Sequence, residues 1–330
     1  MVRFTVLASG SKGNSTVVTG GRTRILVDAG LSCRELFRRM KVAGEDPGTL
    51  DAIVVTHEHQ DHINGLAVIA RRLGIPVYFT EATHRAWMRW LTPRRQMSYA
   101  QWLEQCRRQA AERQAEAETA QEEGEPDEPE IADQVQIQAQ AEEVAAPAEP
   151  LSIKTDPVKT DPTWLQAVEY FQAGQPFVIG DIDLSPFTIP HDAADPVGFV
   201  FAAEGVRMAF ATDLGYITPN VKAQLRGVDL LLLESNHDLE MLRDGPYPWS
   251  VKQRVLSRVG HLSNEAAAEF LATGYDGQAA YVILAHLSES NNLPELARVA
   301  AERALQGRAS LLANRLMVAA QHEPLSAIYF

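Results

Sequence analysis

The sequence predicts a layered α/β fold, in which mixed sheets of strands are covered by helices. Short apolar runs of strand length alternate with amphipathic segments of helical period, and this alternation occurs on both sides of a long acidic segment. The chain has 330 residues, of which 45% are apolar, so it can bury a substantial core. The acidic segment interrupts this pattern, and we therefore expect one globular body with an insertion.

The N-terminal part is expected to hold five strands and two helices. The strand runs are apolar and rich in β-branched residues, and a Ser/Gly loop at 9–15 separates the first two of them. The helical runs place apolar residues three and four positions apart. The strands are expected at 2–7, 16–18, 24–27, 52–55 and 76–80, and the helices at 35–41 and 64–73.

The same pattern resumes after residue 166. The run at 229–233 is wholly apolar except for its first residue, which predicts a strand buried on both faces. Asn292, with Glu295 three residues later and Pro294 between them, resembles a capping box at the start of a helix. Strands are expected at 177–179, 182–189, 197–203, 207–211, 229–233 and 280–284, and helices at 264–272 and 292–305.

Residues 98–165 differ in composition from the rest of the chain. Residues 104–150 alone hold 14 of the 43 Asp and Glu residues but 3 of the 30 Lys and Arg residues. A segment this polar buries too little apolar surface to offset its ordering entropy. We expect an exposed helix after Glu104 followed by a disordered acidic insertion, with the catalytic body at 1–97 and 166–330. The insertion is either a solvated spacer or a tether for a protein partner.

Composition also excludes several classes of protein. The net charge of −13 resides mostly in the insertion, so it is weak evidence against a polyanionic substrate. Cys33 and Cys106 form no C-x-x-C pair, so neither a disulfide framework nor a thiolate metal site is expected. The chain opens directly into a strand, and its apolar runs are too short to span a membrane. We expect a soluble cytoplasmic protein with no membrane partner.

The most informative motif follows the expected strand at 52–55. It places His57, His59, Asp61 and His62 within six residues. Side chains alternate along a strand, so His57 and His59 point the same way, and a turn then brings Asp61 and His62 to the same pocket. Imidazole nitrogens and a carboxylate suit zinc, manganese or iron. The alternative is a chance cluster on a polar loop.

Three later residues are placed to complete a two-metal site. His191, Asp213 and His286 each follow the end of an expected strand, where a sheet projects side chains into a shared crevice. Taken singly, each histidine is explained equally well as a metal ligand or as a hydrogen-bonded loop residue. Asp213 is likewise explained equally well as a ligand or as a turn residue. Taken with the first motif, they supply the seven ligands that two metal ions require.

The pattern H-x-H-x-D-H resembles the signature of metallo-β-lactamase-fold hydrolases, and the order of the later residues matches their phosphodiesterase branch. Within it, the chain is similar to the YycJ-type (WalJ-type) metallohydrolases over 1–97 and 166–330, nearly all of the globular part. The acidic insertion departs from that family, whose corresponding connection is short. The similar stretches are 6–15, 57–62, 191–198, 212–216, 234–238, 246–249 and 260–265.

The resemblance implies a four-layer αββα sandwich with a two-metal site that holds Zn²⁺ or Mn²⁺. It assigns His57, His59 and His191 to one metal. It assigns Asp61, His62 and His286 to the other metal, with Asp213 as the bridge between the two. It further implies a 5′-to-3′ exonuclease that acts on double-stranded DNA.

Other residues are candidates for supporting roles. His261 precedes the helix N-cap Ser263 and is expected to bind phosphate or act as general acid, with a capping-loop histidine as the alternative. Asp28 is expected to orient a metal-bound histidine, unless it is a plain turn residue. Asn236 and His237 are expected either to contact substrate or to be structural.

Weaker evidence comes from a loop and from two basic runs. The Ser/Gly loop at 9–15 either cradles phosphate or makes a tight turn. The basic runs either follow a phosphate backbone or form solvated faces. These runs are Arg34, Arg38, Arg39 and Lys41, and then Lys252, Arg254 and Arg258.

Two kinds of function compete with a DNA exonuclease. One is a ribonuclease or a small-molecule phosphodiesterase built on the same site. The other is a regulatory protein that binds partners through the acidic insertion, in which case a degenerate metal site is expected. All seven expected ligands are present, which favours an enzyme.

Overall fold

The computed structural model describes residues 1–92, 103–104, 107–108, 161–306 and 315–330. Residues 1–92 and 161–330 form one compact unit, and residues 93–160 are assigned to another. The acidic insertion expected at 98–165 lies almost wholly outside the described residues. The following description concerns the first unit alone.

The first sheet of this unit has seven strands. Strand β2 pairs antiparallel with β1 on one side and with β3 on the other, whereas neighbouring strands from β3 to β6 are parallel. In spatial order it consists of β14 (Ile328–Tyr329), β1 (Arg3–Ala8), β2 (Ser15–Gly20), β3 (Thr23–Val27), β4 (Ala52–Val54), β5 (Val77–Phe79) and β6 (Val168–Tyr170).

The second sheet repeats this plan with seven more strands. Here β7 to β10 are antiparallel, whereas β10 to β13 are parallel. In spatial order it consists of β13 (Arg315–Val318), β12 (Tyr281–Ala285), β11 (Leu230–Glu234), β10 (Val206–Ala211), β9 (Val197–Ala203), β8 (Ile182–Thr188) and β7 (Phe177–Ile179).

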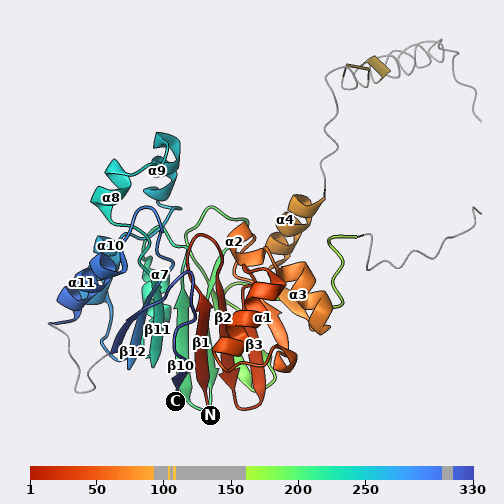
Figure 1. The fold of residues 1–330 in the computed structure, drawn as a ribbon, viewed down its shortest axis with the longest axis horizontal. Helices are drawn as coiled ribbons and strands as arrows, with labels where there is room; N and C mark the ends of the chain where they lie inside the picture. Colours follow the sequence, from red (N-terminus) through yellow and green to blue (C-terminus); the bar gives the residue numbers. More distant parts are fainter. Residues whose placement is uncertain (93–102, 105–106, 109–160, 307–314) are drawn as a thin grey trace, which may run out of the picture. The chain divides into compact units, whose positions relative to one another are not determined.

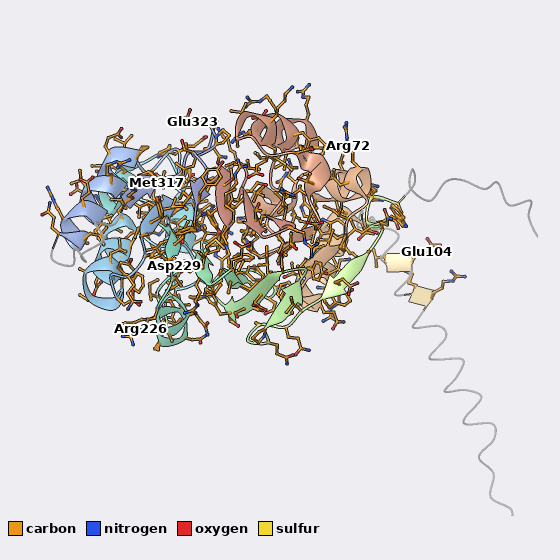
Figure 2. All side chains as sticks on the ribbon, turned by 90° about the horizontal axis from the view of Figure 1, so that it is seen from below. Arg72, Glu104, Arg226, Asp229, Met317 and Glu323 are labelled. Carbon is orange, nitrogen blue, oxygen red and sulfur yellow. The ribbon has the colours of Figure 1, made fainter. Side chains whose placement is uncertain are left out.

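Helices cover the outer face of each sheet (Figure 1). On the first sheet, Leu36, Ile69 and Trp87 bury the apolar faces of α1 (Cys33–Val42), α3 (Leu66–Leu73) and α4 (Glu81–Leu91). The second sheet is covered by α7 (Pro219–Gln224), α10 (Asn264–Glu269) and α11 (Pro294–Leu305). Side chains from both sheets fill the space between them, as the sticks in Figure 2 show. The predicted four-layer αββα sandwich is therefore confirmed.

The expected helix at 64–73 begins later than predicted, because Gly65 interrupts it. The N–H of Gly65 donates to the carbonyl of Ala29 (2.8 Å), and a Cβ at this position would lie 2.0 Å from the Leu31 oxygen. The chain therefore forms a short helix α2 (Gln60–Ile63), which carries Asp61 and His62, before α3 starts. This break holds the histidine motif against the loop that follows β3.

The capping box expected at Asn292 is wrong. Helix α11 starts at Pro294 with Leu293 as its N-cap and has no side-chain cap. The Asn292 amide instead donates to the carbonyls of Ser235 and Asn236 (2.9 and 3.0 Å). Asn292 is thus used to tie the loop after β11 to the start of α11.

Three further short helices complete the described part of this unit. They are η1 (Pro47–Thr49), α8 (Leu239–Asp244) and α9 (Trp249–Val255). Helix α10 continues into one turn of π-helix, η2 (Phe270–Gly274). Among the described residues, no helix combines the length and the apolar character that crossing a bilayer would need.

The basic face expected on α1 is only partly available, because Arg39 is buried. Its guanidinium pairs with Glu35 (2.7 Å) and donates to the carbonyls of Leu7 and Gln321 (3.2 and 2.6 Å). Arg39 thereby joins α1 to β1 and to the C-terminal segment. Arg38, by contrast, is exposed, and its one ion pair within the described part of the chain is with Glu35 on its own helix.

Replacing these two arginines separately should give different losses of stability. Arg39→Met leaves two buried carbonyls without a donor, and we expect it to lower the free energy of unfolding by about 2–3 kcal/mol. Arg38→Met removes an exposed pair and should cost less than about 0.5 kcal/mol. Urea unfolding of the two variants measures both values, and equal losses would contradict the anchoring role of Arg39.

Candidate metal centre

The seven predicted ligands lie together at one edge of the sandwich. Asp28 and His57 follow the parallel strands β3 and β4, while Asp213 and His286 follow β10 and β12, which are both parallel to β11. Carboxyl ends of parallel strands meet at the same sheet edge, so each sheet delivers its side chains to one place. His191 reaches this edge from the loop after β8.

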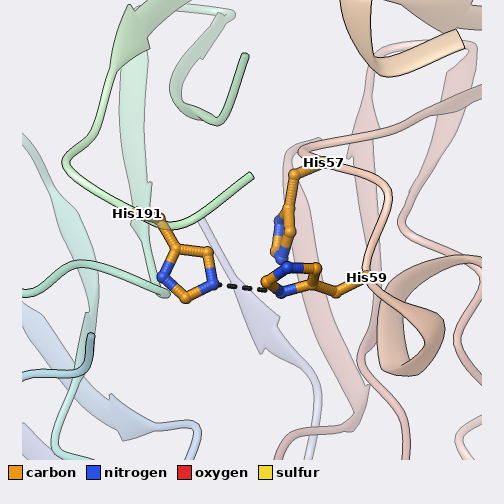
Figure 3. A group of neighbouring side chains, drawn as sticks. All are labelled: His57, His59 and His191. Atoms are coloured by element: carbon orange, nitrogen blue, oxygen red, sulfur yellow. Dashed lines mark hydrogen bonds between the residues drawn. The ribbon is translucent and has the colours of Figure 1, made fainter. Parts of the chain in front are cut away.

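His57, His59 and His191 form the first half of the site. Their ring nitrogens lie within 4.8 Å of one another, and His59 Nδ1 is 3.1 Å from His191 Nε2. Figure 3 shows His57 and His59 on one loop, with His191 facing them from the opposite loop. The Nε2 atom of His57 is buried and has no hydrogen-bond partner. Three converging nitrogens, one of them unpaired, fit a divalent metal.

Asp61, His62 and His286 form the second half. Asp61 Oδ2 lies 3.4 Å from both His62 Nε2 and His286 Nε2. Asp213 lies between the two halves: its Oδ2 is 3.3 Å from His62 Nε2, and its Oδ1 is 3.9 Å from His191 Nε2. Asp213 Oδ2 is buried and accepts no hydrogen bond, so this carboxylate has a free lone pair directed into the cluster.

Each of the five histidine rings is held by a partner on its outer nitrogen. The Nδ1 atoms of His57, His62, His191 and His286 contact Thr56 Oγ1 (3.0 Å), Asp28 Oδ2 (2.8 Å), Gly260 O (3.1 Å) and Glu234 Oε1 (2.7 Å), respectively. In His59 it is Nε2 that contacts a carbonyl, that of Asp192 (3.2 Å). The other nitrogen of every ring faces the cluster, which is the arrangement that fixes histidine tautomers in metal sites.

Asp28 has the position that the sequence predicts for it. Its carboxylate is fully buried, contacts His62 Nδ1, and accepts from the N–H and the hydroxyl of Thr56 (both 2.9 Å). Thr56 in turn contacts His57, so one carboxylate orients a histidine in each half of the site. Asn14 of the Ser/Gly loop adds a hydrogen bond to Asp61 (3.0 Å). This loop therefore braces the cluster.

Sequence reasoning missed Glu234 as a functional residue. Its Oε1 accepts from both His286 and His261 (2.7 and 2.9 Å), and its Oε2 accepts from the N–H groups of Leu214 and Leu262 (both 3.0 Å). The available signal was a carboxylate at the end of the buried apolar strand 229–233. A charged residue there requires partners, and these partners are histidines of the site.

Backbone strain is concentrated at this edge. Of the four non-glycine residues with positive φ among those described, three are Asp28 (60°), Asp213 (62°) and His286 (57°). A left-handed conformation of this kind costs about 1–3 kcal/mol per residue. The surrounding sheets hold these residues in conformations that turn their side chains into the site.

Burial and charge set the protonation of the cluster. Burial lowers the pKa of His57 well below its ordinary value, and it also lowers the pKa values of His59 and His191. These rings are neutral, as metal ligands must be. Burial opposes the charged form of His62 and His286, but the carboxylates around them, Asp213 first, raise the pKa of both rings well above the ordinary value. A metal dication would replace the proton on the cluster-facing Nε2 of each of these two rings, and the Nδ1 protons would stay in their hydrogen bonds to Asp28 and Glu234.

A pocket of about 220 Å³ opens onto the cluster. His261 and Asn236 line it together with His59, Asp61, Asp213 and His286. The amide of Asn236 donates to the His286 carbonyl (2.8 Å). His261 is held through Nδ1 by Glu234, which leaves Nε2 available for a substrate. Helix N-cap Ser263 follows at the start of α10, as predicted.

His237 differs from the other candidates, because it is buried and does not line this pocket. Both of its ring nitrogens are buried without a hydrogen-bond partner, and burial lowers its pKa to about 4. The folded protein therefore keeps His237 neutral down to a pH at which the unfolded chain already binds a proton.

This buried histidine should make the metal-free protein less stable in mild acid. The unfolded chain gains a proton below about pH 6.5 and the folded chain only near pH 4, so the free energy of unfolding falls across that window. His237→Phe should remove about 2 kcal/mol of the fall between pH 7 and pH 5. Urea unfolding at pH 7, 6 and 5 measures the slope, with exposed His322→Gln as the control. An unchanged slope in His237→Phe would contradict the burial argument.

Loss of the Asp28 carboxylate should weaken metal binding without removing any ligand. Asp28→Asn disturbs the tautomer of His62 and the hydrogen bond of Thr56, and we expect a metal affinity lower by about 10- to 100-fold. Competition with a chromogenic chelator measures the affinity. Asp183→Asn, at an exposed position on β8, is the matched control, and equal affinities in the two variants would refute the orienting role.

Comparisons with known proteins agree with this geometry. The metallo-beta-lactamase superfamily model matches residues 8–249. Exodeoxyribonuclease YycJ of Bacillus anthracis is 32% identical over 305 residues, which cover 92% of this chain and 89% of the relative. Exodeoxyribonuclease WalJ of Streptococcus pneumoniae serotype 2 is 30% identical over 90% of this chain and 86% of its own.

Among solved structures, the metallo-beta-lactamase fold protein YhfI from Bacillus subtilis is similar, with a TM-score of 0.57 at 14% identity. The similarity covers 98% of this chain and 99% of that one, and at this identity it demonstrates the fold alone. The match to the family model and the identity with the two curated relatives establish more than the fold. The chain belongs to the metallo-β-lactamase superfamily and, within it, to the YycJ/WalJ family.

Proposed function

We propose that this metal-dependent hydrolase is a two-metal exodeoxyribonuclease that removes nucleotides from the 5′ ends of double-stranded DNA. The observation that carries the proposal is the cluster of five histidines and two aspartates, four of which line a pocket. Two relatives that are named exodeoxyribonucleases, each at least 30% identical over at least 90% of this chain, favour DNA as the substrate.

The residues of the cluster divide into two ligand sets. His57, His59 and His191 would hold one divalent ion. Asp61, His62 and His286 would hold the second ion, and Asp213 would contact both. These nitrogen and oxygen donors fit Zn²⁺ and Mn²⁺ alike. When bound, such a pair of ions supplies Lewis-acid activation of water and stabilises the charge of an in-line phosphoryl displacement.

The chain supplies the remaining groups for hydrolysis of the diester. His261 lies at the pocket wall, with Nδ1 fixed by Glu234, so its Nε2 is oriented to protonate the leaving oxygen as general acid. Asn236 and Ser11 line the same pocket and offer polar contacts to the phosphate. Asp61 and Asp213 contribute to catalysis by contacting His62 and His286. These contacts fix the two imidazole rings in position around the reacting phosphate.

The acidic insertion has a separate place in the proposal. We assign residues 1–97 and 166–330 to the catalytic body and residues 98–165 to an interaction segment, because of the concentration of negative charge in the latter. Its chemistry suits a basic protein partner. With DNA as the proposed substrate, and with Cys33 and Cys106 in no C-x-x-C pair, we propose a cytoplasmic location for the enzyme.

The proposal is tested by incubating metal-loaded protein with end-labelled duplex DNA, with matched RNA and a chromogenic β-lactam in parallel. We expect stepwise release of nucleotides from the 5′ ends of the DNA. His59→Ala and Asp213→Asn should each lower this rate by at least about 100-fold, because each removes a proposed ligand. Exposed His322→Ala is the matched control and should cleave at the wild-type rate.

Other outcomes would redirect the proposal. Cleavage of RNA alone would move the chain to the ribonuclease alternative, and hydrolysis of small diesters alone to the small-molecule alternative. A metal-loaded protein that cleaves nothing would favour a regulatory role. A variant lacking residues 98–160 should keep its rate on DNA, and loss of the rate together with the fold would refute a separate insertion.

A further inference from the structure

Exposed aromatic and aliphatic side chains are concentrated in the segment of α8 and α9, which also contributes to the pocket at the metal centre. The described residues include fifteen large hydrophobic side chains that are exposed, and five of them fall within residues 239–259. Trp249 is 67% exposed, among the highest values of the group. Figure 1 shows α8 and α9 standing away from the sheets, at the end where α2 carries part of the site. The five residues are Leu239, Trp249, Val251, Leu256 and Val259.

The same segment forms one wall of the catalytic pocket. Tyr247, Val251, Arg254 and Val255 line the pocket together with His59, Asp61 and Asp213. A molecule that occupies the pocket therefore meets α9. Tyr247 lies two residues before Trp249, so aromatic side chains stand both at the pocket and on the exposed surface next to it.

The charge of α9 and of the loops on either side of it is complementary to a polyanion. Residues 245–260 contain Lys252, Arg254 and Arg258 and no acidic residue. The Arg258 guanidinium lies over the Tyr216 ring, 4.4 Å from its centre, and Lys252 donates to the Arg243 carbonyl (2.6 Å). Both contacts fix the conformation of residues 245–260, which we call the arm, and its cationic side chains stay accessible to solvent.

Arg254 connects this arm to the metal centre. It is the single lysine or arginine among the residues that line the pocket. Its guanidinium forms a two-pronged pair with Asp192, whose carbonyl contacts His59. The Arg254 side chain is nevertheless 57% exposed, so it can reach a phosphate next to the one being cleaved.

We propose that residues 247–258 bind an unpaired stretch of the DNA strand, with a base stacked on Trp249 and a phosphate held by Arg254. This inference rests on the proposed function and names the form of DNA that the site takes. Aromatic side chains followed by cationic ones on the same short segment suit a single strand, because its bases expose faces for stacking at about 1–3 kcal/mol each. Bases inside a duplex are already stacked on one another, so the arm should favour frayed or overhanging ends.

The test measures binding by fluorescence anisotropy, with the full-length, metal-loaded protein and a labelled phosphorothioate oligothymidylate that resists cleavage. Trp249→Ala should lower the affinity by about 5- to 150-fold, the factor that loss of one stacked base predicts. Trp249→Phe keeps an aromatic face and should restore most of the affinity. Trp90→Ala is the matched control, since Trp90 is also exposed but lies on α4, and it should bind like the wild type.

The form of the DNA provides the second comparison. Trp249→Ala should weaken binding to a duplex with a 5′ overhang more than binding to a blunt duplex. Unchanged affinity of Trp249→Ala for the oligothymidylate, with wild-type urea midpoint and metal content, would overturn the inference. Equal losses of affinity for the overhanging duplex and the blunt duplex would overturn the claim that the arm binds a single strand. Binding of a protein but of no DNA would overturn it as well.

Failure of this inference is distinguishable from failure of the proposed function, because binding is measured without turnover. Cleavage of DNA together with binding that does not depend on Trp249 would support the exodeoxyribonuclease and contradict the DNA-binding role of the arm. Binding that depends on Trp249, in a protein that cleaves no DNA, would support the DNA-binding role of the arm and contradict the nuclease activity.

Discussion

The burial of several carboxylates among histidines at one sheet edge is the constraint on which the rest of this structure depends. Asp28, Asp213 and Glu234 are almost completely buried, and Asp61 is mostly so. Buried charges persist only when they are paired. Without a metal, protons on His62 and His286 provide that pairing, which is why the pKa of each ring is raised. A divalent ion provides the same compensation with more charge and leaves both rings neutral.

The fold supplies the means of gathering these groups. Each sheet turns from antiparallel to parallel near its middle, and the parallel strand ends carry Asp28 and His57 in one sheet and Asp213, Glu234 and His286 in the other. Three of these residues adopt left-handed conformations that only a well-packed core can maintain. Part of the stability of the sandwich therefore offsets the strain of the backbone conformations that hold the site in place.

Much of the fold and of the site could be predicted from the sequence, for physical reasons. Apolar runs mark buried strands directly, and side chains at the ends of parallel strands are expected to meet, so the sequence predicts the seven residues that the structure brings together. The role of Glu234 was not visible, because its partners are 27 and 52 residues away. The predictions for Arg39 and Asn292 are wrong for the same reason: local patterns predict a basic helix face and a helix cap, whereas distant carbonyls determine where both side chains lie. The break at Gly65 likewise depends on Ala29 and Leu31, which no local window contains.

The central claim is that two metal ions share this cluster through Asp213. Anomalous diffraction from crystals of the zinc- or manganese-loaded protein, recorded at the absorption edge of the metal, tests it most directly. The account predicts two peaks about 3.5–4 Å apart, with His57, His59 and His191 around one peak, Asp61, His62 and His286 around the other, and Asp213 between them. A single peak in the fully loaded protein, or peaks away from these residues, would contradict it.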